Sequence, residues 1–253
     1  MNERSSVCPG CGALDCTVVG SKEGYRFLKC ELCTLIFVDP MPGSAELNAF
    51  YQSYHKTSQY TAKIDSKQRR ARKRIKSVMK QTNGKAFIDV GCNAGFAVEA
   101  ARTLGLNAYG IDIDESSIAA ARNYFPQATF DTMSIQALAE TGRIFDLIYC
   151  SEVIEHLPEV HSFVASLYKI LNTDGVLFIT TPDIGHRSVA KNPLIWDAVR
   201  PPEHLLHFSK TALKKLLKAH GFSRVKTQFN FKPTLKAVVK KIYYQFVQFL
   251  HQY

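Results

Sequence analysis

A glycine-rich turn and an acidic residue that follows it form the most informative pattern in this 253-residue sequence. Gly91 and Gly95 bracket a turn that leads into an alanine-rich segment, 96–104. Glycine lets the backbone approach a ligand closely, and the free N–H groups at a helix start favour an anionic group. Asp112, 23 residues after Asp89, ends the next predicted strand, where an acid can accept hydrogen bonds from both hydroxyls of a ribose. The pattern predicts a nucleoside-binding site.

The turn differs from the dinucleotide-binding pattern Gly-x-Gly-x-x-Gly. Asn93 stands where the second glycine of that pattern would fall, and Asp89 lies at the turn itself. In dinucleotide-binding proteins the second glycine lets the backbone approach a pyrophosphate. The sequence therefore argues against a pyrophosphate cofactor.

Four segments in order resemble class I S-adenosylmethionine-dependent methyltransferases. The first is the acidic-x-Gly-x-x-x-Gly motif from Asp89, and the second is the strand that ends at Asp112. Residues 145–157 look like the fourth strand of that family and the helix after it, and residues 171–182 resemble its helix-turn-fifth-strand signature. The resemblance covers about residues 70–230, and the core resembles the O-methyltransferases of ubiquinone biosynthesis.

Alternating apolar and amphipathic segments predict an α/β fold with a Rossmann-like, mostly parallel sheet and helices on both faces. The predicted strands are 86–90, 107–112, 128–131, 144–150, 174–180 and 222–229, and the predicted helices are 95–104, 115–124, 160–171 and 209–220.

The resemblance implies roles for individual residues. The glycine turn would line the methionine part of the cofactor, Asp112 its ribose and Ile113 its adenine, while Ser134 replaces an aspartate that many relatives have. One arginine of the 70–74 stretch would reach the cofactor carboxylate. The complete set of predicted cofactor-binding residues is Asp89, Gly91, Cys92, Gly95, Asp112, Ile113, Met133, Ser134, Cys150, Ser151 and Arg74.

Three histidines are candidates for acceptor chemistry. His204 and His207 follow the fifth predicted strand, where the family places acceptor-site residues, and a neutral histidine is a suitable base near pH 7. His156 ends a Glu-x-x-Glu-His run with Glu152 and Glu155. In the quinone methyltransferases this run is associated with a divalent metal such as Mg²⁺, which would acidify an acceptor hydroxyl. The alternative is a structural role in fixing the loop.

Four cysteines predict a zinc ribbon at the N-terminus. Cys8, Cys11, Cys30 and Cys33 form C-x2-C-x18-C-x2-C, the spacing of two knuckles that surround one Zn²⁺. Because all four positions are cysteine, no site is left for water, and the zinc should be structural. Cys16 falls outside this pattern.

The sequence suggests four modules with different compositions. These are the ribbon (1–40), a helical lid or linker (41–80), the methyltransferase-like core (81–230) and a C-terminal amphipathic basic helix (231–253). That last helix would pack on the core, join two chains in a homodimer or rest on a membrane surface. The family's last strand would then be missing, which would leave a sheet edge exposed.

The formal net charge is +10, with basic residues concentrated in 63–80 and 210–241. Such surfaces attract phosphates of RNA, of a nucleotide-sugar or of a membrane, although a solvated helix face gives the same pattern. The N-terminus lacks the apolar region of a secretory signal, and no apolar run is long enough to span a membrane. We therefore expect a cytoplasmic protein, with peripheral contact at the inner face of the membrane through the C-terminal helix.

These observations predict an S-adenosylmethionine-dependent methyltransferase that modifies a small molecule at a hydroxyl, either of a phosphate-bearing sugar or of a quinone-like phenol. Two other functions fit the same residues. One is methylation of an RNA base, with nucleic acid as the partner, and the other is a catalytically silent scaffold that binds the cofactor.

Overall fold

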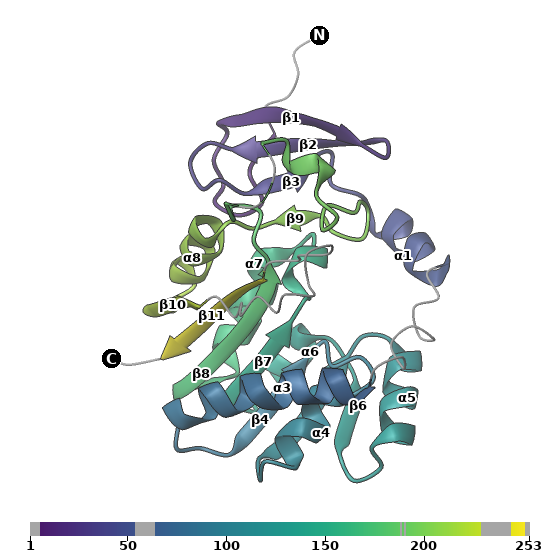
Figure 1. Ribbon diagram of the computed structural model, residues 1–253, viewed down its shortest axis with the longest axis vertical. Helices are drawn as coiled ribbons and strands as arrows, with labels where there is room; N and C mark the ends of the chain where they lie inside the picture. Colours follow the sequence, from purple (N-terminus) through teal and green to yellow (C-terminus); the bar gives the residue numbers. More distant parts are fainter. Residues whose placement is uncertain (1–5, 54–63, 188, 190, 229–243, 251–253) are drawn as a thin grey trace, which may run out of the picture.

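The computed structural model describes residues 6–53, 64–187, 189, 191–228 and 244–250 (Figure 1). A seven-stranded sheet runs in the order β10-β11-β8-β7-β4-β5-β6. Five of these strands, β8 to β6 in that order, pair in parallel. Their bounds are β4 Ala86–Val90, β5 Asn107–Asp112, β6 Thr129–Thr132, β7 Phe145–Ser151 and β8 Leu171–Pro182.

Helices cover both faces of this sheet, because the parallel strands present apolar side chains to both sides. In β7, Leu147 and Tyr149 pack with one cluster, whereas Ile148 and Cys150 pack with another. The first face is covered by α3 (Ile64–Val78), α4 (Phe96–Arg102) and α5 (Glu115–Tyr124), and the second by α6 (Ile135–Glu140), α7 (Val160–Lys169) and α8 (Lys210–Ala219). The predicted Rossmann-like fold is confirmed.

The described part of the predicted lid contains two helices. The first, α1, spans Ser44–Ser53, and α3 begins at Ile64, while the tyrosine-rich segment around residues 54–60 lies outside the described residues. Short 3-10 turns are η1 (Met79–Gln81), η2 (Ile154–His156) and η3 (Pro193–Ile195). None of the helices in the described part of the chain combines the length and the hydrophobicity that crossing a bilayer requires.

The N-terminal ribbon is joined to the core by a shared sheet. Its strands β1 (Cys16–Lys22), β2 (Tyr25–Cys30) and β3 (Ile36–Val38) pair antiparallel, and a fourth strand, β9 (Leu206–His207), extends the sheet. Buried ribbon residues belong to the same hydrophobic cluster as the core. The character of the sequence changes near residue 40, but the hydrophobic packing continues from the ribbon into the core.

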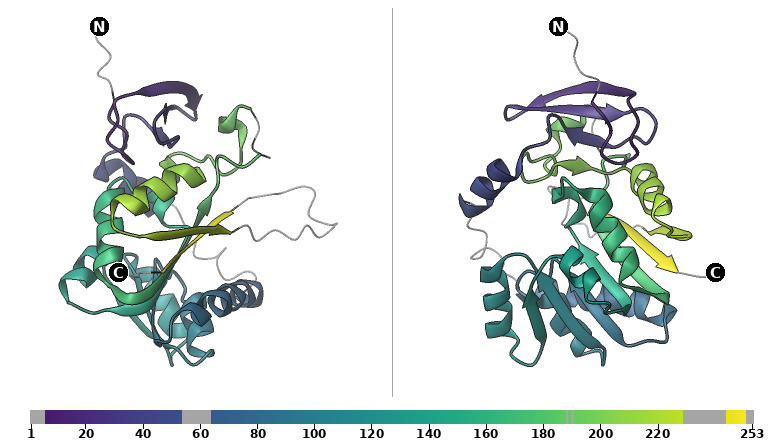
Figure 2. Two further views of the ribbon diagram at one scale, coloured as in Figure 1. Left: turned by 90° about the vertical axis from the view of Figure 1, so that its left-hand side faces the viewer. Right: turned by 180° about the vertical axis from the view of Figure 1, so that it is seen from behind.

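The C-terminal segment differs from the helix that we predicted. Residues Tyr244–Leu250 form strand β11, which lies between β8 and β10 (Arg224–Gln228) and is antiparallel to both (Figure 2). Residues 229–243 lie outside the described residues. The three- and four-residue apolar spacing misled the prediction, because pairing with two exposed strand edges outweighs helical periodicity. The membrane and dimer contacts predicted for that helix therefore lose their basis.

The position of β11 predicts that deleting residues 244–253 destabilises the protein. The deletion would remove backbone hydrogen bonds on both sides of β11 and expose the edge of β8, so we expect a loss of at least about 3 kcal/mol in the free energy of unfolding. Urea denaturation and light scattering would measure stability and aggregation, with deletion of 251–253 alone as the control. Equal stability of the two truncations would contradict the strand assignment.

Candidate active site

The glycine-rich turn lies at the carboxyl end of β4, the middle strand of the five parallel strands (Figure 1). Gly91 and Gly95 have φ values of +75° and +80°. A Cβ on Gly91 would lie 2.5 Å from Val153 Cγ2, and one on Gly95 would lie 2.6 Å from Phe130 Cζ. Both positions therefore require glycine for conformation and for space.

Asp112 fixes this turn from the end of the neighbouring strand. Its Oδ2 accepts a hydrogen bond of 2.8 Å from the backbone N–H of Asn93, and its Oδ1 accepts one of 3.0 Å from that of Asp114. Asn93 has a φ of +45°, which asparagine tolerates better than most residues. Each carboxylate oxygen keeps a second lone pair, so Asp112 can still accept hydrogen bonds from a ligand.

Asp89 and Asp112, the two acids beside the turn, both have a raised pKa. Asp89 is only 4% exposed, and burial raises its pKa well above the ordinary value, with a further rise from the charge of Asp112. Burial also raises the pKa of Asp112, while the N–H groups of Asp114 and Asn93 oppose that rise. A ligand that brings a cationic group would stabilise the ionised form of Asp89.

A pocket of about 170 Å³ opens beside the turn and beneath α3. Cations line it on the α3 side, and Asp89 and the turn line the other side. Its lining residues are Lys67, Arg70, Ala71, Arg74, Asp89, Gly91, Cys92, Asn93, Phe96, Ala97, Tyr149 and Ser151. The pocket therefore brings together Arg74, Asp89, Gly91, Cys92 and Ser151 from the predicted set.

Arg74, the arginine of the predicted set, lines this pocket together with Arg70. It is 8% exposed, and its Nη1 donates to Tyr149 Oη and to Ser151 Oγ, each at 3.1 Å. Arg72, one of the alternatives, donates instead to Thr103 Oγ1 at 2.9 Å, away from the pocket. The basic stretch around α3 thus supplies cations to a pocket as well as to the surface.

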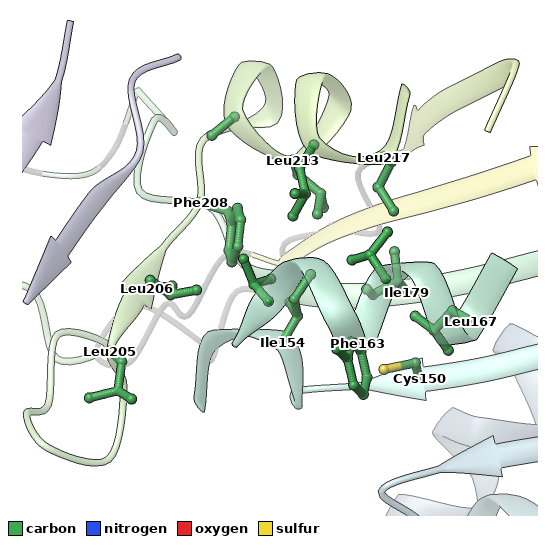
Figure 3. Packing of buried hydrophobic residues seen from close by; sticks show 14 of the residues in the cluster. Cys150, Ile154, Phe163, Leu167, Ile179, Leu205, Leu206, Phe208, Leu213 and Leu217 are labelled. Atoms are coloured by element: carbon green, nitrogen blue, oxygen red, sulfur yellow. The ribbon is translucent and has the colours of Figure 1, made fainter. Parts of the chain in front are cut away.

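Several other predicted cofactor-binding residues lie elsewhere. The Cys150 side chain is fully buried in the core near Phe163 and Leu167, so only its backbone is near the pocket (Figure 3). The Ser134 hydroxyl caps α6 by accepting from the N–H of Ala137 at 3.1 Å.

Two further predicted residues, Ile113 and Met133, come just after β5 and β6 and are not among the residues that line the pocket. Ile113 is 77% exposed directly after Asp112, so an apolar surface is available to a flat ring. The N–H of Met133 donates to the carbonyl of Asp112 at 3.0 Å.

Sequence reasoning missed Lys67 and Tyr149 as pocket residues. Tyr149 follows the period-2 alternation that places Ser151 at the pocket, so this signal was present in the strand.

The three predicted histidines form one cluster, although they come from two separate segments. The His156 and His204 rings lie 4.7 Å apart, and those of His204 and His207 lie 6.3 Å apart, measured between centroids. His156 Nδ1 donates to the carbonyl of Glu203 and His204 Nδ1 donates to the carbonyl of Ala198, each at 2.6 Å. These bonds fix the tautomer with the proton on Nδ1, so that Nε2 carries the lone pair.

Burial keeps two of these histidines neutral. It lowers the pKa of His204 to about 2, helped by the charges of His156 and His207. It lowers the pKa of His207 to about 3, helped by the charge of Lys22. Both rings are therefore neutral at pH 7, and their charged form is costly unless an anion lies beside it.

Glu155 places a buried carboxyl group in this cluster. Ligand atoms of Glu155, His156 and His204 all lie within 4.8 Å of one another. Glu155 is 1% exposed, and burial and the charge of Glu152 raise its pKa well above normal. The Thr181 hydroxyl lies close enough to oppose this rise, but within the described residues neither Glu155 carboxylate oxygen has a hydrogen-bond partner of normal geometry.

Glu152, which we predicted as a third metal ligand, points elsewhere. Its Oε1 accepts from Thr180 Oγ1 at 2.6 Å, and burial raises its pKa to about 7. Its φ of +60° redirects the chain immediately after β7. The structure therefore groups His204, and not Glu152, with Glu155 and His156.

The four ribbon cysteines converge as predicted. The Sγ atoms of Cys8 and Cys33 are 3.6 Å apart and those of Cys11 and Cys30 are 3.5 Å apart, with all four inside 4.8 Å. Thiolates at tetrahedral corners about 2.3 Å from Zn²⁺ would be separated by about 3.8 Å. The donor set therefore fits a closed structural zinc site.

Comparisons with known proteins agree with this geometry. The model of the family described as "Methyltransferase domain" matches residues 58–227. The chain is 34% identical over 99 residues to a ubiquinone biosynthesis O-methyltransferase of Bartonella quintana (strain Toulouse), covering 38% of the chain and 40% of the relative. It is 32% identical over 120 residues to the enzyme of that name from Glaesserella parasuis serovar 5 (strain SH0165), covering 43% and 51%. The chain spans about half the length of these relatives or less.

Among solved structures, the chain resembles the 1,6-didemethyltoxoflavin-N1-methyltransferase of Burkholderia thailandensis, which was crystallised with 1,6-didemethyltoxoflavin and S-adenosylhomocysteine. The TM-score is 0.62 at 16% identity, and the match covers 92% of this chain and 97% of that one. At this identity the likeness concerns the fold alone.

The low pKa of His204 predicts acid-dependent destabilisation. Its folded pKa lies below the unfolded value of about 6.5, so the unfolded chain binds the proton first as pH falls. Its contribution is thus present above pH 6.5 and declines below it, by up to about 1.4 kcal/mol per pH unit. His204→Asn, which keeps a donor for Ala198, should reduce the loss in unfolding free energy between pH 6.5 and pH 5 by about 2 kcal/mol.

Urea denaturation at several pH values would test this expectation, with His161→Asn at an exposed histidine as the control. Equal pH slopes for wild type and His204→Asn would contradict it.

Proposed function

Because the chain belongs to the methyltransferase domain family, we propose that it transfers a methyl group from S-adenosylmethionine to a hydroxyl of a small molecule, such as a sugar or a quinone-like phenol. The observation that carries this proposal is the charge arrangement of the pocket. Arg74 from α3 and the buried Asp89 from β4 line the same pocket, next to the glycine turn that Asp112 fixes. Such a pair complements the carboxylate and the ammonium group of an amino acid, with a ribose acceptor close by.

The cofactor supplies a methyl group activated on a sulfonium centre, and the residues of the chain bind, orient and deprotonate. Arg74, with Arg70 and Lys67 nearby, would hold the carboxylate, and Asp89 would face the ammonium group. Asp112 would accept from the ribose hydroxyls, and Ile113 would pack on the adenine. Catalysis of this kind depends mainly on positioning and on removal of the acceptor proton.

His204 is the group that we propose to accept the acceptor proton, at Nε2. Its Nδ1 proton is committed to Ala198, and its Nε2 accepts a long hydrogen bond of 3.4 Å from Arg200 Nη2, which the acceptor hydroxyl would displace. Glu155 lies within 4.8 Å and in its ionised form would stabilise the protonated ring. His156 lies in contact with His204, and His207 stands behind it in β9, where it can hold the ring in place. Stabilising a protonated His204 would explain why a carboxyl group is buried at position 155, which packing alone does not explain.

A divalent cation is the second way in which these residues could acidify an acceptor hydroxyl. Glu155, His156 and His204 would hold it, but two imidazoles and one carboxylate suit Mn²⁺, Fe²⁺ or Zn²⁺ better than the Mg²⁺ that we expected, since Mg²⁺ prefers oxygen ligands. A separate Zn²⁺ bound by Cys8, Cys11, Cys30 and Cys33 would be structural.

Cofactor binding is the first measurement. Calorimetry should show binding of S-adenosylmethionine and S-adenosylhomocysteine but not of NAD or ATP. Arg74→Gln should weaken that binding about 10- to 100-fold, because a charged hydrogen bond contributes about 1.5–3 kcal/mol. Arg72→Gln, at an arginine outside the pocket, is the matched control and should bind as wild type does. Folded protein that binds none of these compounds, or binds NAD equally well, would refute the proposal.

Acceptor chemistry is tested with a panel of quinols, catechols and nucleotide-sugars, with methylated products detected by mass spectrometry. We expect Glu155→Gln and His204→Asn to lower turnover at least about 100-fold, the usual share of general acid–base catalysis. Glu159→Gln, at an exposed glutamate nearby, is the control. Calorimetry with Mn²⁺ separates the two routes: one ion bound by zinc-loaded wild type and lost in Glu155→Gln supports the metal, whereas no binding supports the proton route.

A further inference from the structure

The segment that carries His204 and His207 is built into the ribbon sheet. The N–H of Val38 donates to the carbonyl of Leu205 at 3.0 Å, and the Cα register pairs Ile36 with His207. Strand β9 has only two residues, which is too short to hold its extended conformation alone. Its geometry therefore depends on β3 of the ribbon.

Ribbon side chains contact this segment at its start, middle and end. Lys22 Nζ donates to the carbonyl of Val199 at 2.6 Å. The Phe27 ring lies 5.6 Å from the His207 ring, measured between centroids. At the end, the hydroxyl groups of Thr34 and Ser209 share a hydrogen bond of 2.5 Å. All three contacts fall within residues 198–209, which we call the histidine segment.

Thr34 makes its contact from an unfavourable conformation. Its φ is +67°, a region that β-branched residues rarely adopt. Such strain persists only where the surrounding structure compensates for it. Here the Thr34 hydroxyl bonds Ser209, whose Oγ also accepts from the N–H of Ala212 and caps α8. The knuckle after Cys33 is thus linked directly to the end of the histidine segment.

The opposite side of the histidine segment faces the core. The N–H of Leu205 donates to the carbonyl of Glu155 at 2.8 Å, and His156 donates to the carbonyl of Glu203. Figure 3 shows Phe208 packed between α8 and Ile154. The segment is therefore held between the ribbon and η2. By contrast, the pocket beneath α3 has no lining residue from the described part of the ribbon, residues 6–40.

We propose that the ribbon is the positioning element for the acceptor half of the site and that the cofactor half stands without it. Lys22, Thr34 and β3 fix the histidine segment, and the four cysteines hold the knuckle from which Thr34 projects. Loss of the zinc or of the Thr34 hydroxyl then loosens residues 198–209 and leaves cofactor binding intact. Calling these regions the acceptor half and the cofactor half rests on the proposed function. The dependence of residues 198–209 on the ribbon does not rest on it.

Hydrogen exchange measured by mass spectrometry tests the coupling on the 253-residue chain. Zinc-loaded protein is compared with protein stripped by a chelator and with Cys33→Ser, while calorimetry with S-adenosylhomocysteine reports on the pocket. We expect exchange in peptides covering 198–209 to rise at least about tenfold, with the affinity for S-adenosylhomocysteine within about twofold of wild type.

Thr34 variants provide a second test that keeps the zinc ligands. Thr34→Val should raise exchange in 198–209, and Thr34→Ser, which retains the hydroxyl, should restore protection. Thr17→Val is the matched control, because the Thr17 hydroxyl bonds Glu31 within the ribbon at 2.6 Å. With an acceptor in hand, Thr34→Val should raise KM for the acceptor and leave KM for the cofactor unchanged.

Two outcomes would overturn the inference. Unchanged exchange in 198–209 after zinc loss and in Thr34→Val would show that the core alone holds the segment. Equal loss of S-adenosylhomocysteine binding would show that the ribbon supports the whole fold. If zinc-loaded protein fails to bind S-adenosylhomocysteine, the proposed function fails instead, and the exchange experiment still decides the coupling.

Discussion

The parallel pairing of β4, β5, β7 and β8 is the constraint on which the rest of the structure depends. Parallel strands deliver their carboxyl ends to one edge of the sheet, so residues far apart in sequence meet there. Asp112 and Ser151 end strands at this edge, and the glycine turn and Glu155 follow strands there. The helices on the two faces protect the strands from water, and α3 additionally supplies the cations of the pocket.

This edge concentrates ionisable groups that are not balanced within the chain. Burial raises the pKa values of Asp89 and Glu155 and lowers those of His204 and His207, so each group is driven towards its neutral form. Such groups lower stability and are retained where a ligand or reaction uses them. A zwitterionic cofactor beside Asp89 and a proton or cation beside Glu155 would each supply the missing charge.

The ribbon gives the fold a property that neither module has alone. A metal held by the four cysteines would stabilise a small sheet with few buried residues, and β9 connects that sheet to the segment that carries His204 and His207. The pocket and the histidine cluster thus rest on different supports, α3 and the glycine turn for the pocket, and the ribbon and η2 for the histidines. If the proposed function holds, the acceptor side could change while the cofactor side keeps its geometry.

The sequence by itself determined the features that local chemistry encodes. These are the cysteine knuckles, the glycine turn with Asp112, the alternation of strands and helices, and the Ser209 cap, because each depends on neighbours close in the chain. Only the tertiary structure decided what depends on distant partners. It placed Tyr244–Leu250 in the sheet, replaced Glu152 by His204 beside Glu155, and paired β9 with the ribbon, since strand pairing and burial override local periodicity and motif spacing.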